Sequence, residues 1–125
     1  MAQAAAMAHI ADLAEYVATS PSSYHAAASA AKRLDAVGFT ALDEKQAWNL
    51  GPGSYYVVRD GAIIAWVQPE AATATSGFHI LGAHTDSPGF KLKPKPTTGS
   101  HGWLQAGVEV YGGPLLNSWL DRELE

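Results

Sequence analysis

The sequence contains no cysteine, which excludes both a disulfide framework and a thiolate metal site. Any metal ion that these 125 residues bind must therefore be held by histidine, aspartate or glutamate side chains. A cysteine-free composition also fits a protein that works in the reducing cytoplasm, and we expect a cytoplasmic location.

Long apolar runs are missing as well. No segment reaches the roughly 18 consecutive apolar residues that a membrane-spanning helix needs. The N-terminal MAQAAAMAHIADL has neither the basic start nor the continuous apolar core of a signal peptide. We therefore expect a protein without a membrane partner.

Positive charge is scarce too. Eight Lys and Arg residues face twelve Asp and Glu residues, so the formal net charge is −4. Nothing in this charge balance suggests binding to phosphate backbones, so we expect no nucleic-acid partner.

Apolar residues make up 47% of the chain, enough for a globular core, and their spacing predicts two helices. One apolar stripe runs through residues 5–18 at the helical period; its members are Ile10, Leu13, Ala14 and Val17. Pro21 should end this helix, because the residue before a proline avoids helical backbone. Ser22 or Ser23 can then cap a second helix that ends at Gly38.

The rest of the chain predicts strands. Residues 54–59 and 62–68 flank Asp60-Gly61, a dipeptide that favours a tight hairpin turn, and both arms are apolar enough to be buried on both faces. Further strands are expected at 78–83, at 91–96 as a short edge strand, and at 104–111. Two helices followed by four or five strands indicate a layered domain of helices and sheet.

One short motif carries chemistry. GAHTDSP, residues 82–88, places His84 and Asp86 directly after the apolar run FHIL. In extended backbone, residues i and i+2 point to the same side, and a carboxylate beside a histidine can fix the ring for metal binding. A lone His-x-Asp is nevertheless more often a loop histidine followed by a turn-capping aspartate, so the surrounding sequence has to decide.

That surrounding sequence resembles a known family. Three segments, SPSSYHAAASAAKRLDAVGF, GAHTDSPGFKLKPKP and GVEVYGGPLLNSWLDREL, are similar to the N-terminal part of the aspartyl aminopeptidases, which are dodecameric zinc metallo-aminopeptidases. The resemblance implies an α/β fold, in which a zinc-peptidase-like mixed sheet is flanked by helices and interrupted by a β-rich insertion. Residues 1–111 then correspond to the N-terminal part of the catalytic domain, and 112–125 begin the insertion (dimerisation) domain.

The same resemblance assigns roles to individual residues. His84 matches the family's first metal-ligand histidine. Asp86 matches the catalytic-site carboxylate that orients this imidazole without binding the ion. Asp121 and Arg122 match the start of the insertion, where we expect a packing role. His25 lies in the helix-start motif, and we interpret it as a helix-end histidine with a local hydrogen bond.

The implied reaction removes one N-terminal residue from a peptide, with Asp and Glu preferred. Two co-catalytic Zn²⁺ ions, or Mn²⁺ or Co²⁺ in their place, would activate the attacking water. The family's other metal ligands and its general base come after the insertion. One histidine cannot hold zinc, which needs at least three protein ligands. We therefore interpret the 125 residues as an incomplete portion, inactive alone, of an enzyme that forms homo-oligomers when full length.

Other functions stay open from the sequence. A related co-catalytic zinc carboxypeptidase or amidohydrolase would share the His-x-Asp motif. A noncatalytic truncated remnant could instead bind a full-length relative and modulate its assembly, and a small peptide-binding module is a third alternative.

Several remaining side chains have a simpler structural interpretation. Lys91, Lys93 and Lys95 alternate along one predicted strand, where they protect a solvated edge or, alternatively, attract an acidic substrate. His79 should be an ordinary strand residue. The four tryptophans are expected to be core or interface anchors.

Overall fold

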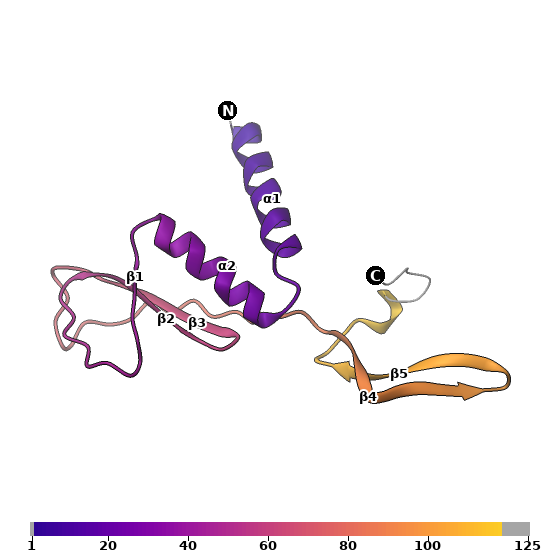
Figure 1. Ribbon diagram of the computed structural model, residues 1–125. Coiled ribbons are helices and arrows are strands. Elements are labelled where there is room, and N and C mark those ends of the chain that lie inside the picture. Colours follow the sequence, from indigo (N-terminus) through magenta and orange to yellow (C-terminus); the bar gives the residue numbers. More distant parts are fainter. Residues whose placement is uncertain (1, 119–125) are drawn as a thin grey trace. The chain divides into compact units, whose positions relative to one another are not determined.

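The computed structural model describes residues 2–118. The chain divides into two compact units, Met1–Asp86 and Ser87–Glu125. In the first unit, helices α1 (Ala2–Ala18) and α2 (Ser23–Ala36) precede strands β1 (Thr40–Ala41), β2 (Gly53–Arg59) and β3 (Ala62–Gln68) (Figure 1). No helix in the described range is long and apolar enough to cross a membrane.

Both predicted helices are present, and α2 ends as its sequence predicts. Gly38 adopts a φ of 87°, a left-handed conformation that costs glycine little. Its N–H donates to the carbonyl of Asp35 (3.0 Å), and the N–H of Phe39 donates to that of Leu34 (3.0 Å). This pair of bonds is a Schellman motif, and it satisfies carbonyl groups that a helix end leaves unpaired.

The first sheet is mixed, with strand order β1-β2-β3. β1 pairs with β2 in parallel, and β2 pairs with β3 antiparallel from Gly53↔Gln68 to Arg59↔Ala62. The predicted hairpin turn at Asp60-Gly61 is confirmed, and Asp60 has a φ of 53°. β1 was not predicted, since a two-residue strand leaves no periodic signal.

The hairpin is less buried than predicted. Tyr56 and Val57 of β2 are buried together with Ala26 and Ala27 of α2, so the core lies where this helix packs on the hairpin. The prediction that both arms are buried on both faces is wrong for β3, where the side chain of Ile64 remains 66% exposed. α2 covers only part of the sheet, and the helix's small alanines allow a close approach.

The predicted strand at 78–83 is also absent, although its sequence is apolar. Residues 78–84 form neither helix nor strand, and Phe78 and Leu81 are 89% and 101% exposed. A strand exists only beside a partner that completes its hydrogen bonds, and no strand in residues 2–118 pairs with this segment. The interpretation of His79 as a strand residue therefore fails as well.

The second unit contains a two-stranded antiparallel hairpin of β4 (Gly89–Ser100) and β5 (Trp103–Tyr111), followed by a 3₁₀ turn at Leu116–Ser118 (Figure 1). The strand predicted at 91–96 is present within β4, but it is longer than predicted, because β4 has 12 residues. Its register shifts between Leu92 and Thr97. Pro94 and Pro96 lie in this irregularity and cannot donate to the ladder. The strand predicted at 104–111 is confirmed as β5, and the α/β class holds for the chain.

Candidate functional site

His84 lies at the end of an exposed, irregular segment rather than at the end of a strand. Residues 71–84 are all exposed, and a bend at Thr85 and Asp86 follows. The Nδ1 atom of His84 is within hydrogen-bonding distance of the main-chain carbonyl oxygen of Asp86. A carbonyl oxygen only accepts hydrogen bonds, so in the neutral imidazole this contact places the proton on Nδ1 and leaves the Nε2 lone pair available.

This ring arrangement fits a metal ligand. Metal-binding histidines commonly donate their second ring N–H to a carbonyl or carboxylate, which fixes the tautomer and the ring orientation. Among the described residues, however, no three His, Asp or Glu side chains come together as a metal site. His84 fits one position of a zinc site, and the described part of this chain supplies no complete ligand set.

Asp86 is half-buried, in contrast to the exposed His84. Its carbonyl receives the contact from the His84 ring, and the proposed action of its carboxylate on that imidazole remains a prediction. The two residues lie close together because a bend, not extended backbone, joins them.

Thr85, between the two, links the motif to the rest of its unit. Its hydroxyl donates to the carbonyl oxygen of Gly61 in the β2–β3 turn (2.7 Å). This contact joins residues 24 positions apart, and sequence reasoning missed it. No local pattern reveals such a pair; the only sequence signals are the hydroxyl inside the motif and the glycine of the predicted turn.

Two other histidines have local partners. The Ser22 hydroxyl lies 2.8 Å from His25 Nδ1, so His25 is bonded at the start of α2, as interpreted from the sequence. Ser22 is the N-cap residue of α2, yet its side chain makes no capping hydrogen bond. His101 lies in the β4–β5 turn with a φ of 53°, and its Nδ1 is 2.7 Å from Ser100 Oγ.

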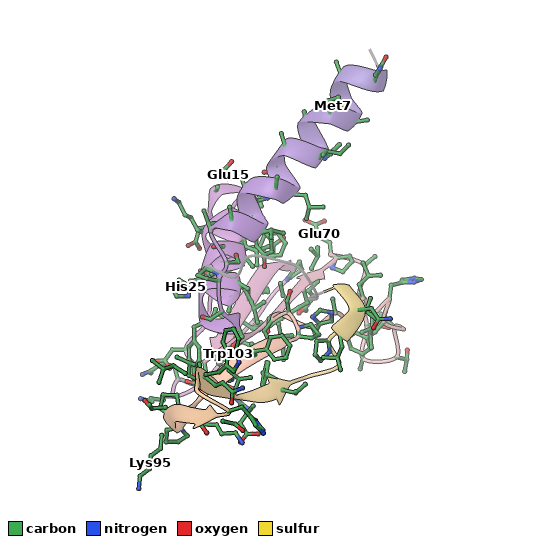
Figure 2. All side chains as sticks on the ribbon, turned by 90° about the vertical axis from the view of Figure 1, so that its right-hand side faces the viewer. Met7, Glu15, His25, Glu70, Lys95 and Trp103 are labelled. Carbon is green, nitrogen blue, oxygen red and sulfur yellow. The ribbon has the colours of Figure 1, made fainter. Side chains whose placement is uncertain are left out.

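The β4 lysines make contacts across the second hairpin. Lys91 Nζ lies 3.7 Å from the ring centroid of Tyr111, and Lys93 Nζ lies 3.4 Å from Glu109 Oε1. The side chain of Lys95 extends away from the hairpin (Figure 2). The two cross-strand contacts support a structural role for Lys91 and Lys93.

The tryptophans differ in their surroundings. Trp48 and Trp66 have ring centroids 5.9 Å apart, and the ring centroid of Tyr55 lies 5.8 Å from that of Trp66; both pairs are tilted. Trp103 is 73% exposed and is not a core residue of the described structure. Trp119, Asp121 and Arg122 lie outside the described residues.

Comparison with known proteins finds relatives that belong to one family. The family described as aminopeptidase I zinc metalloprotease (M18) matches residues 16–125. Probable M18 family aminopeptidase 2 of Streptomyces coelicolor is 55% identical over 116 residues, which cover 93% of this chain and 27% of that relative. The protein of the same name from Mycobacterium leprae is 43% identical over 117 residues, covering 94% and 28%.

A solved structure agrees with these relatives. A chain in the cryo-EM structure of the Ape4 and Nbr1 complex matches with a TM-score of 0.76 and 41% identity, covering 89% of this chain and 22% of that one. The chain thus spans about a quarter of the length of the relatives that it matches.

Proposed function

Because the chain belongs to the aminopeptidase I zinc metalloprotease (M18) family, we propose that it forms part of a metal-dependent aminopeptidase that removes N-terminal residues, preferably Asp or Glu, from peptides. The family match supports the peptidase activity and zinc as the metal. The preference for acidic residues is supported by the resemblance of the GAHTDSP and YGGPLLNSW segments to aspartyl aminopeptidases.

The proposed site rests on one observation. The Nδ1 atom of His84 contacts the main-chain carbonyl of Asp86, and this leaves Nε2 available as a ligand atom. When bound, the metal would activate water for attack on the peptide carbonyl. His84 would hold one side of the ion, and Asp86 would keep the ring in the required tautomer and orientation. Since the described residues contain one such candidate ligand, we propose that the 125 residues alone are inactive.

We also propose that the complete protein acts as a homo-oligomer in the cytoplasm. Family resemblance supports the oligomer, and the cysteine-free composition is compatible with that location.

The test is a peptidase assay on the complete natural protein with peptides that begin with Asp, Glu or Leu, in the presence of Zn²⁺, Mn²⁺ or Co²⁺. We expect a chelator to abolish cleavage and His84→Ala to reduce it to background. Asp86→Asn keeps the main-chain carbonyl that the ring contacts and removes only the carboxylate charge. It therefore tests the proposed action of the carboxylate on the imidazole, for which we expect kcat/KM to fall by about 10–100-fold. The matched control is His9→Ala, because His9 is exposed on α1 and precedes the family match.

Different outcomes separate the parts of this proposal. Full activity of His84→Ala would show that the motif does not bind the metal. Faster cleavage after Leu than after Asp or Glu would remove the acidic preference alone. Metal-dependent cleavage by the isolated 125 residues would show a complete site within them.

A further inference from the structure

Thr85 marks the point where an exposed connection returns to the folded unit. The preceding residues 71–84 are all exposed, whereas Thr85 is half-buried. No strand ladder holds residues 78–84. The direction in which His84 projects therefore depends on local contacts at this point.

The acceptor of the Thr85 hydrogen bond is a turn carbonyl. β2 and β3 pair as far as Arg59↔Ala62, so Asp60 and Gly61 lie outside the ladder. A main-chain carbonyl outside a ladder has no backbone partner from the sheet and accepts from a side chain or from water. The Thr85 hydroxyl, 2.7 Å from the Gly61 oxygen, supplies it.

The turn itself lies close to the first residue of α2. A Cβ atom at Gly61 would lie 2.7 Å from the Cβ of Ser23 and 3.3 Å from the carbonyl carbon of Ser23, closer than such atoms pack. Ser23 is the first residue of α2. The Gly61 carbonyl is therefore attached to a turn that packs directly on a helix.

The residue that makes this attachment, Thr85, lies between His84 and Asp86. The ring contact from His84 Nδ1 to the Asp86 carbonyl spans Thr85, so both ends of the contact adjoin the residue that is bonded to the turn. We propose that Thr85 is a positioning residue: its hydrogen bond to Gly61 holds the His84–Asp86 bend and fixes the direction of the His84 imidazole. This inference rests on the proposed metal-binding role of His84.

The test compares Thr85→Val, which keeps the shape and removes the hydroxyl, with Thr85→Ser, which keeps the hydroxyl. Both are made in the complete natural protein. Zinc dissociation constants are measured by competition with a chromogenic chelator, and the visible spectrum of the Co²⁺-loaded protein reports the ligand geometry. Thr75→Val is the matched control, because Thr75 lies in an exposed loop of the same unit.

We expect Thr85→Val to raise the zinc dissociation constant about tenfold, the lower end of the range for groups that orient a metal ligand, and to change the cobalt spectrum. Thr85→Ser should restore both. A merely structural hydroxyl would lower the melting temperature and leave the affinity and the spectrum of the folded protein as they were.

The outcomes distinguish this inference from the proposed function. If the wild type cleaves peptides in a chelator-sensitive way and Thr85→Val binds zinc like the wild type, the positioning role is wrong and the function stands. Equal loss of affinity in the Val and Ser variants would also overturn the role of the hydroxyl. If the wild-type protein binds no metal, the proposed function fails and this inference fails with it.

Discussion

At the scale of single residues, one tyrosine hydroxyl links the sheet to helix α2. Tyr56 donates a hydrogen bond to the Asp35 carboxylate (2.7 Å). The pKa of Tyr56 is raised above its ordinary value of 10.0 by three effects. The largest is this hydrogen bond; desolvation and the negative charge of Asp35 are smaller. A raised folded-state pKa stabilises the protein below the unfolded-state pKa, and this contribution is lost as the pH rises through the folded-state pKa.

We therefore predict that Tyr56→Phe lowers the melting temperature at neutral pH and that its difference from the wild type shrinks as the pH rises above about 10. Thermal unfolding followed by circular dichroism at several pH values measures this difference. Tyr24→Phe is the control, since Tyr24 is 62% exposed on α2, the helix that carries Asp35. A pH-independent difference would mean that the Tyr56 hydroxyl does not titrate with the predicted shift.

At the scale of elements, the contact between the β2–β3 turn and α2 gives a second prediction. Gly61→Ala introduces a methyl group that overlaps the side chain of Ser23. We expect a loss of about 1–3 kcal/mol in the free energy of unfolding, as for other overpacked sites. Urea unfolding measures it. Gly77→Ala is the control, because nothing lies within 4 Å of a Cβ atom there and the backbone is not left-handed; similar losses in both variants would argue against the overlap.

The same elements show what the sequence could predict. The end of α2 at Gly38 and the turn at Asp60-Gly61 were predictable because each depends on the conformation of one or two residues. The segment 78–83 was not, since its apolar pattern says nothing about whether a neighbouring strand is present. The length of β4 likewise depends on its pairing with β5 across the prolines.

For the candidate site, the sequence supplied the chemistry and not the geometry. His84 and Asp86 were recognisable from their motif, whereas the bend that joins them replaced the expected extended backbone. The Thr85–Gly61 hydrogen bond connects residues 24 positions apart and depends on how the hairpin packs. Contacts of that kind follow from tertiary structure, which no local pattern encodes.

At the scale of the whole molecule, the described chain leaves much of its apolar surface in water. Its buried apolar residues are two alanines, one tyrosine and one valine: Ala26, Ala27, Tyr56 and Val57. By contrast, Phe78, Ile80 and Leu81 are more than four-fifths exposed within one short segment, at 89%, 84% and 101%. Apolar segments that are neither packed nor paired tend to associate.

We predict that the isolated 125-residue chain self-associates at micromolar concentration and binds an apolar fluorescent dye, and that Phe78→Lys reduces both. Thr75→Lys adds the same charge three residues away without removing an apolar side chain, so it should leave both unchanged. Sedimentation velocity over a range of concentrations measures association. If Phe78→Lys and Thr75→Lys reduced association equally, charge repulsion would be the cause of the reduction. A wild-type chain that is monomeric and binds no dye would show that the 78–81 segment is covered in solution.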